Sequence, residues 1–193
     1  AALPLMEFQN LSDEDLTAII SYLRVAPAVV NEVAPSELNF IGRAVMATLV
    51  RPRGPTGTPP AVSPPVGATV ERGEYLVNNV AACATCHTQR NFIDGSYTGP
   101  RLAGGSPMPM DDDPDTVLTP PNLTPEPTTG HIYGWTAEQF IARFRAGRLR
   151  EGTHMPWEQF ARMSDDDLRA IYMYLRTVEP VVNDPGPIVR TTK

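Results

Sequence analysis

The feature that most constrains this chain is a short run with two cysteines and a histidine, Cys83-Ala84-Thr85-Cys86-His87. A C-x-x-C-H run is typical of a c-type haem attachment site. Two thiols three positions apart can add to the two vinyl groups of one porphyrin, and the adjoining imidazole can bind the iron from the proximal side. A redox dithiol or half of a zinc site is the alternative, but a zinc site needs more thiolates or histidines, and these are the only two cysteines in the chain. We therefore predict one covalently attached haem c with its iron.

Composition narrows the remaining possibilities. The 193 residues contain no run of 18 or more apolar side chains, so we expect no transmembrane segment. The formal net charge of -6 argues against a nucleic-acid partner. The sequence starts at Ala1 without a methionine, which suggests a processed or trimmed chain.

An internal repeat links the two ends of the chain. Residues 3–32 and 155–184 share 14 identities in 30 at a constant offset of 152. Within the repeat, residues 12–25 and 164–177 each show a serine N-cap, an acidic first turn and an apolar stripe, so both are predicted helices. The match extends beyond the helices, since Pro4 pairs with Pro156. We interpret residues 1–33 as the tail of an earlier domain of the same kind, in which Leu3 stands opposite Met155.

Between the two copies of the repeat, the sequence predicts first a helix and then a linker. Residues 36–50 are predicted to form a connecting helix with Ser36 as its cap, so residues 1–50 constitute the helical remnant of a preceding domain plus this helix. Residues 51–66 are dense in proline and glycine and are expected to be an extended linker. The haem domain is then residues 67–193.

Helices and loops alternate in the predicted haem domain. A helix over 70–82 delivers the two cysteines at its end, a second covers 136–148 with Thr136 as cap, and the last is 164–177. Residues 88–134 hold many glycines and prolines without strong periodicity, so we expect loops wrapped around the porphyrin. The predicted fold class is all-α.

Several motifs together resemble the class I cytochrome c family, namely Glu71-Arg72-Gly73-Glu74-Tyr75-Leu76, Cys83-Ala84-Thr85-Cys86-His87, Gly99-Pro100-Arg101-Leu102 and Ile171-Tyr172-Met173-Tyr174-Leu175. A further set is similar to the cytochrome subunits of bacterial membrane-associated dehydrogenases and related diheme cytochromes: Asn122-Leu123-Thr124-Pro125, Gly134-Trp135, Met155-Pro156-Trp157 and Met163-Ser164-Asp165. The resemblance implies a class I cytochrome c fold with long loops around one haem, here preceded by two extra N-terminal helices. It also implies that the first and last helices of the domain cross where Gly73 meets Tyr174.

The resemblance assigns further residues to the haem. It implies that the carbonyl of Pro100 accepts a hydrogen bond from His87, and that Asn122 and Trp135 lie around the haem and hydrogen-bond a propionate. A turn asparagine and a core tryptophan are the plain alternatives for these two residues. The residues alone leave several candidates for the second iron ligand: Met155, Met108, Met110, Met163, His131 and His154. Met155 is favoured because the resembling family places its ligand in the loop before the last helix.

The sixth ligand decides between functions, because a second protein ligand closes the iron to substrates. With His87 and Met155 on the iron, the chain is an electron carrier and not itself an enzyme. Haem attachment of this kind resembles an exported process in bacteria, so the protein is expected to be periplasmic, with any membrane association provided by a partner. It is expected to exchange electrons with a dehydrogenase or a membrane respiratory complex. The alternatives are a peroxidase-like or gas-binding haem with an open sixth site, and a structural docking subunit of a respiratory complex.

One stretch is basic in this acidic chain: Arg143, Arg145, Arg148 and Arg150. We interpret it as a surface that steers an acidic redox partner towards the haem. The alternative is a solvated helix face with one arginine paired to a propionate.

Overall fold

The computed structural model describes residues 8–34, 37–48, 54–91, 95–110 and 113–191. The expectations for Leu3, Pro4 and Ser36 therefore lie outside the described residues. The chain divides into two compact units, the first ending at Ser63 and the second starting at Pro64. None of the helices among the described residues is both long and apolar enough to cross a membrane.

The first unit contains a 3-10 turn, η1 (Phe8–Asn10), and two helices, α1 (Asp13–Val25) and α2 (Phe40–Thr48). The hydroxyl of Ser12 caps α1 by accepting from the backbone N–H of Asp15, as its sequence predicts. Residues expected to be a bare linker return to this helix, because the carbonyls of Pro60 and Ala61 accept from the first backbone N–H groups of α1, each at 3.1 Å. These bonds satisfy donors that a helix leaves open at its start.

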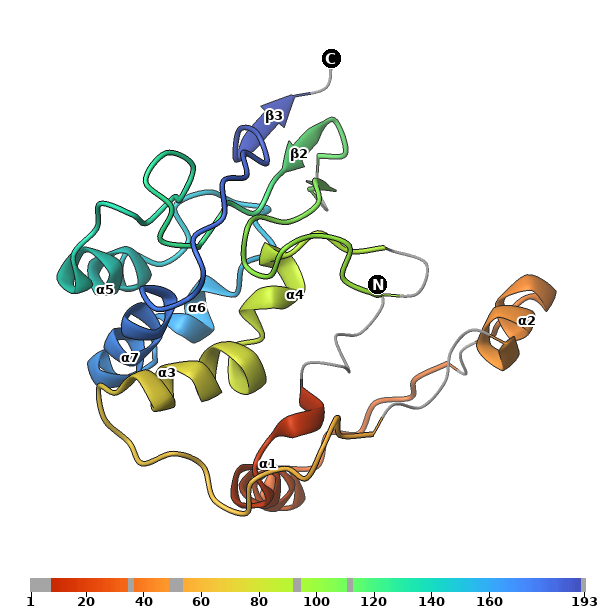
Figure 1. Ribbon diagram of the computed structural model, residues 1–193. Helices are drawn as coiled ribbons and strands as arrows, with labels where there is room; N and C mark the ends of the chain where they lie inside the picture. Colours follow the sequence, from red (N-terminus) through yellow and green to blue (C-terminus); the bar gives the residue numbers. More distant parts are fainter. Residues whose placement is uncertain (1–7, 35–36, 49–53, 92–94, 111–112, 192–193) are drawn as a thin grey trace. The chain divides into compact units, whose positions relative to one another are not determined.

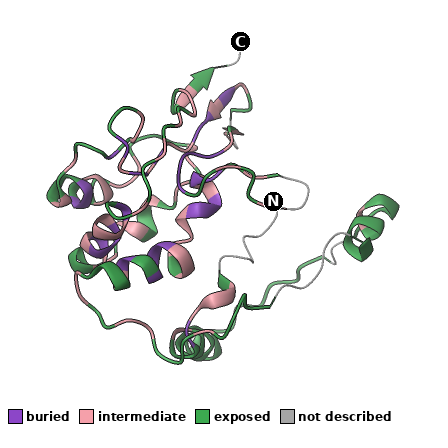
Figure 2. Ribbon diagram, in the orientation of Figure 1, coloured by how far each residue is buried: buried purple, intermediate pink, exposed green. Residues whose placement is uncertain are grey.

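The two copies of the repeat differ in burial. In helix α7 (Asp165–Leu175) of the second unit, the apolar stripe Leu168, Ile171 and Leu175 is at most 4% exposed. The matching side chains of α1, which are Leu16, Ile19 and Leu23, are 46% to 65% exposed. Figure 2 shows this difference as buried residues on α7 and exposed ones along α1. The same stripe therefore belongs to a core in one copy only.

The second unit is mostly helical. Its order is α3 (Val70–Tyr75), a π-helical turn η2 (Leu76–Val80), α4 (Cys83–His87), β1 (Met108–Pro109), β2 (Thr116–Leu118), α5 (Ala137–Arg145), α6 (Trp157–Phe160), α7 and β3 (Val189–Thr191) (Figure 1). The predicted caps Thr136 and Ser164 both accept from the backbone N–H three residues on, and Gln139 completes a capping box on α5.

Helices α3 and α7 pack against each other at a glycine. A Cβ on Gly73 would lie 1.9 Å from the carbonyl oxygen of Ala170 and 2.8 Å from the Cβ of Tyr174. An ion pair of 2.9 Å between Arg72 and Asp167 lies at the same contact and is largely shielded from solvent. The glycine thus lets the backbones of the two helices approach more closely than any other residue would permit.

The core of the second unit joins these helices to the segments between them. Its buried apolar cluster comprises Leu76, Val77, Ala84, Leu102, Ile132, Phe140, Ile171 and Leu175. Cys83, Leu123, Trp135 and Met163 pack against this cluster and are partly buried. Met163, a candidate iron ligand by sequence, therefore packs against the core just before the last helix.

A small sheet stands where only loops were expected. Strands β1, β2 and β3 form an antiparallel sheet in that order, with Met108 opposite Leu118 and Val117 opposite Arg190. The prediction of an all-α fold is wrong in this respect. The strands are two or three residues long, too short to produce a detectable alternation, and β3 pairs across more than 70 residues of intervening chain.

Candidate functional site

The cysteine motif is delivered by a break between two helices. The predicted helix over 70–82 instead changes from α3 to the π turn η2, which closes with a bond from the N–H of Ala81 to the carbonyl of Leu76 at 2.7 Å. Ala82 then adopts a left-handed conformation, with φ 50° and ψ 41°, as the residue preceding α4. A non-glycine residue there costs roughly 1 to 2 kcal/mol. The strain is local to the point where the chain turns into the cysteine motif.

Two thiols are available on α4. Cys83 and Cys86 both carry thiols, form no disulfide and are of intermediate exposure. Burial raises the pKa of the Cys86 thiol, and the positive charge of Arg90 opposes that shift. The separation of three positions places both sulfurs on neighbouring parts of one helix face.

His87 is held in one defined state. Its Nδ1 lies 2.8 Å from the carbonyl oxygen of Pro121. A carbonyl only accepts, so Nδ1 carries the proton and donates it. Burial lowers the pKa of His87 to about 4, with the bond to Pro121 opposing and the charge of His131 assisting. The ring is therefore neutral at pH 7, and its Nε2 lone pair remains available for a metal.

The acceptor for His87 differs from the expected one. Pro121 accepts, whereas the resemblance implied Pro100. The carbonyl of Pro100 instead accepts from the N–H of Ala103 at 3.3 Å, within its own turn. That turn is fixed by Leu102, which is left-handed at φ 60° and donates its N–H to the hydroxyl of Thr88 at 3.0 Å. The Pro100 oxygen is thus engaged within its own turn, and the His87 proton is donated to Pro121.

The backbone after this turn lies directly against the end of α4. The N–H of Gly104 donates to the carbonyl of His87 at 3.0 Å. At Gly105, a Cβ would come within 1.8 Å of the carbonyl oxygen of Cys86. Only glycine fits at such a distance. The backbone of this segment therefore packs directly against the backbone of the cysteine motif, with no side chain between them.

Asn122 is a structural residue and not a propionate donor. It is fully buried, and its Nδ2 donates to the carbonyl of Val181 at 2.9 Å and to the hydroxyl of Thr129 at 3.1 Å. Its Oδ1 accepts from the N–H and the hydroxyl of Thr124, at 2.9 and 2.8 Å. All the hydrogen-bonding capacity of this amide is thus used inside the protein. Its effect is to fix the chain beside Pro121, the acceptor for His87.

Unlike Asn122, Trp135 has a side-chain donor that could still bond to a haem propionate. Its ring packs against the core and lies 5.5 Å from the ring of His131, tilted by 54°. Its carbonyl accepts from the hydroxyl of Tyr172 at 2.7 Å, while its indole N–H donates to none of the described residues. Burial lowers the pKa of His131, and the charge of Arg143 adds to the shift. The indole is therefore the available donor of the expected pair.

The candidates for the second ligand lie in different settings. Met155 is of intermediate exposure in the loop before α6, and its carbonyl accepts from the N–H of Trp157 at 2.8 Å. His154 directs its Nε2 to the carbonyl of Pro109 at 2.9 Å. Met108 lies on strand β1 and Met110 follows it, and both are partly buried.

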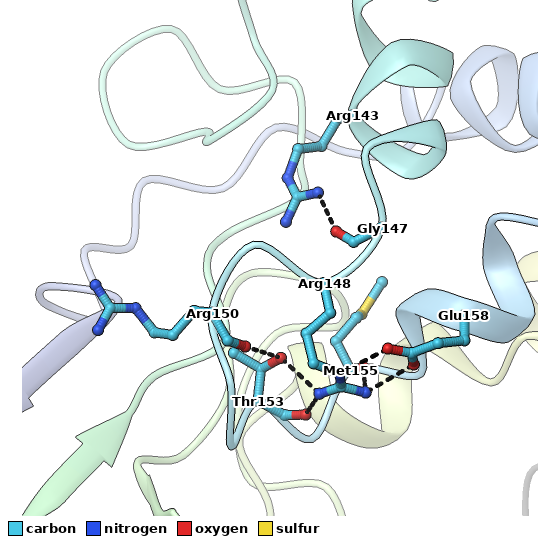
Figure 3. A network of polar contacts seen from close by, with 7 residues as sticks. All are labelled: Arg143, Gly147, Arg148, Arg150, Thr153, Met155 and Glu158. Carbon is cyan, nitrogen blue, oxygen red and sulfur yellow. Dashed lines mark hydrogen bonds and ion pairs between the residues drawn. The ribbon is translucent and has the colours of Figure 1, made fainter.

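The arginine cluster makes internal contacts instead of forming a free basic surface. Arg143 stacks on Trp157, with its Cζ 3.6 Å from the ring centroid, and Arg145 pairs with Asp165. Arg148 pairs with Glu158 at 2.8 Å, while the side chain of Arg150 points away from these contacts (Figure 3). Since two of the four charges are neutralised by carboxylates, the interpretation as a steering patch is wrong for Arg145 and Arg148. Charge counting along the sequence cannot show that carboxylates of the following helices, α6 and α7, pair with these arginines.

Two important residues were missed by sequence reasoning. Pro121 directly precedes the motif that begins at Asn122, and this neighbouring position is the sequence signal that could have identified it. Glu126 gave no signal. Its carboxylate accepts from the backbone N–H groups of Thr128 and Thr129, and the hydroxyl of Thr129 is the largest cause that lowers the pKa of Glu126 to about 2.

These side chains form a donor set that suits haem c. Two reduced thiols on one helix can form thioether bonds, and a neutral imidazole with a fixed Nδ1 presents Nε2 as a ligand. Nothing in this arrangement conflicts with a porphyrin held at α4.

The comparisons with known proteins agree with this chemistry. The family model described as cytochrome c oxidase, cbb3-type, subunit III matches residues 68–175. The chain is 37% identical over 128 residues to a nicotinate dehydrogenase subunit of Pseudomonas putida, covering 64% of this chain and 10% of that protein. It is 33% identical over 144 residues to the fructose dehydrogenase cytochrome subunit of Gluconobacter japonicus, covering 72% of this chain and 27% of the relative.

A third relative is matched over most of this chain. The cytochrome c subunit of the quinone alcohol dehydrogenase of Gluconobacter oxydans is 29% identical over 202 residues, covering 93% of this chain and 39% of the relative. The chain thus spans between 10% and 39% of the length of these three proteins. The family match covers more than half of the chain and includes the cysteine motif, α3 and α7. The chain belongs to this family of cytochrome c domains, whose members bind haem c covalently.

Proposed function

We propose that this protein carries one electron at a time on a single haem c, as the cytochrome part of a dehydrogenase system. Cys83 and Cys86 hold the porphyrin, and His87 and Met155 bind the iron. The observation that carries the proposal is the state of His87, which is neutral, buried and fixed through Nδ1 immediately after the second cysteine. When bound, the haem supplies a reversible one-electron couple.

The domain assignment is part of this proposal. We assign residues 67–193 to a class I cytochrome c domain whose first and last helices are α3 and α7. Their close approach at Gly73 supports that assignment, and so does the burial of the core cluster between them. Residues 1–50 and the linker 51–66 remain outside this domain.

Met155 is the proposed sixth ligand on the basis of its setting. It follows α5 and precedes α6, in a loop whose backbone is tied down at several points. His154 has its Nε2 engaged with Pro109, and Met163 packs against the core. A thioether ligand favours reduced iron and raises the potential, which suits a carrier that accepts electrons from a dehydrogenase.

The relatives support the proposed redox partners. Their names describe subunits of nicotinate, fructose and alcohol dehydrogenases, and two of the names specify cytochrome subunits. We propose that this chain likewise receives electrons from a dehydrogenase and passes them to a respiratory complex. The proposed location is the periplasm, where haem c is attached in bacteria, with any membrane association provided by a partner.

The Met155→Ala variant tests the ligand assignment. Haem attachment should survive, because it depends on Cys83 and Cys86. The ferric near-infrared charge-transfer band of Met-ligated haem should disappear, and the reduced variant should bind carbon monoxide. Met110→Ala is the matched control and should keep the band.

Two results would contradict the proposal. An unchanged band and midpoint potential in Met155→Ala would exclude Met155 as the ligand. Rapid carbon monoxide binding by the unsubstituted protein would indicate an open sixth site, and hence the gas-binding or peroxidase-like function.

A further inference from the structure

We propose that Arg148, together with Glu158, is a positioning residue that fixes the backbone at Thr153 and Met155 and so sets where the Met155 thioether lies. The inference rests on the proposed ligation by Met155. It assigns to Arg148 a function within the haem site in place of one in partner docking.

The guanidinium of Arg148 bonds to two residues of the loop, Thr153 and Met155, and to Glu158 on α6 (Figure 3). Its Nη1 donates to the carbonyl of Thr153 and, at 3.0 Å, to the hydroxyl of the same residue. Its Nη2 donates to the carbonyl of Met155 at 3.3 Å, and Nε and Nη2 form a two-pronged pair with the carboxylate of Glu158, each at 2.8 Å. The loop and the start of α6 therefore surround one cation, which is contacted before, at and after Met155.

This arrangement bears on the sulfur because the Met155 side chain is flexible. A methionine has three rotatable bonds, so its sulfur is well placed only if its backbone is fixed. Arg148 and the N–H of Trp157 both bond to the carbonyl of Met155, which leaves the peptide little freedom to rotate. In Figure 3 the Met155 side chain extends away from the guanidinium, so the cation fixes the backbone without contacting the sulfur.

The other two internal arginines hold the rest of the same segment. Arg143 stacks on the ring of Trp157. Arg145 donates to the carbonyls of Ala161 and Met163, at 2.8 and 2.7 Å. Helix α5 and the turn after it thus hold the loop at successive points towards α7. Among these arginines, Arg148 is the one that bonds to Met155.

The contacts of Arg148 differ from those of an ordinary surface ion pair. Its side chain is 22% exposed and that of Glu158 is 52% exposed, so the pair alone would contribute little. The backbone acceptors matter more, because a lysine cannot reach the same set with one ammonium group. Loss of the fork should raise the population of the Met-dissociated state by about tenfold or more, since hydrogen bonds from a charged group are among the stronger ones.

The test compares variants of the haem-loaded chain: Arg148→Ala, Arg148→Lys, Glu158→Gln and the matched control Arg150→Ala. Arg150 is two positions away and carries the same charge, but its side chain points away from the network. The measurements are the near-infrared band of the ferric form against temperature and the rate of carbon monoxide binding to the reduced form. Far-UV circular dichroism reports whether the fold is intact at each temperature.

The expected result is carbon monoxide binding at least about tenfold faster in Arg148→Ala, with a smaller gain in Arg148→Lys and the smallest in Glu158→Gln. The band should fade at temperatures where the dichroism is still that of the folded protein. Arg150→Ala should match the unsubstituted chain. If Arg148→Ala does not load haem, Arg148→Lys and Glu158→Gln decide by the same measurements.

Two outcomes overturn different claims. If Met155→Ala abolishes the band but the Arg148 and Glu158 variants bind carbon monoxide as slowly as Arg150→Ala, Arg148 does not position the ligand. A gain that appears only as the fold melts has the same meaning, because Arg148 then supports the whole domain. If Met155→Ala leaves the band in place, the ligand assignment fails first and the positioning inference fails with it.

Discussion

Replacing Gly73 by alanine should separate α3 from α7 and destabilise the second unit. The new Cβ would lie 1.9 Å from the carbonyl oxygen of Ala170, and ordinary contact requires the helices to move apart by about 1.5 Å. The obstructing atoms belong to the backbone, so no side-chain rotation relieves the clash. Overpacking of this kind costs about 3 kcal/mol, and alanine regains about 1 kcal/mol of helix propensity. The net loss is about 2 kcal/mol.

Thermal unfolding of the haem-loaded protein measures this loss. For a unit of this size, about 2 kcal/mol corresponds to a fall in Tm of about 8 °C. Gly134→Ala is the matched control, because a Cβ there meets no atom within 4 Å. If Gly73→Ala unfolds at the same temperature as Gly134→Ala or higher, the close approach of the two helices is not a constraint on the fold.

Two further predictions concern the segment that supports His87. Asn122→Ala should lower the free energy of unfolding by about 3 kcal/mol, because it leaves the buried N–H of Thr124 without its partner and removes the 2.9 Å bond to the carbonyl of Val181. The urea midpoint should fall without a change in slope. Glu126 is 5% exposed, and its pKa falls from an ordinary 4.5 to about 2 in the folded protein. Its stabilising contribution is therefore complete above pH 4.5 and is lost as the pH falls from 4.5 towards 2. In Glu126→Gln the free energy of unfolding should fall less steeply between pH 4.5 and 2, whereas the exposed control Glu179→Gln should leave that fall unchanged. Equal pH dependence of the unfolding free energy in both variants would refute the assignment.

Local sequence signals located the helices and the reactive residues well. The caps Ser12, Thr136 and Ser164 are all present, because a serine or threonine cap satisfies donors within three residues of itself. The cysteine motif could be recognised for a similar reason, because the two cysteines and the histidine that a porphyrin requires all lie within five consecutive residues.

Contacts between distant segments were not predictable in the same way. The acceptor for His87, the carbonyl of Pro121, is 34 residues away in the sequence, and no local pattern marks it. Asn122 was assigned to the haem, although its partners at Val181 and Thr129 consume its amide. In both cases the residue type indicated hydrogen bonding, and only the fold shows with which group.

The two sides of the proposed iron site are supported by different kinds of contact. On the His87 side, the supports are backbone contacts and buried amides, including the approach of Gly105 to Cys86 and the bonds of Asn122. On the Met155 side, the supports are long arginine side chains at the surface, the nearest of which pairs with a half-exposed glutamate. Buried backbone contacts open only with the core, whereas exposed polar contacts open locally and at lower cost. The Met155 loop should therefore release its ligand before the fold gives way, while His87 and the thioether links keep the haem in place.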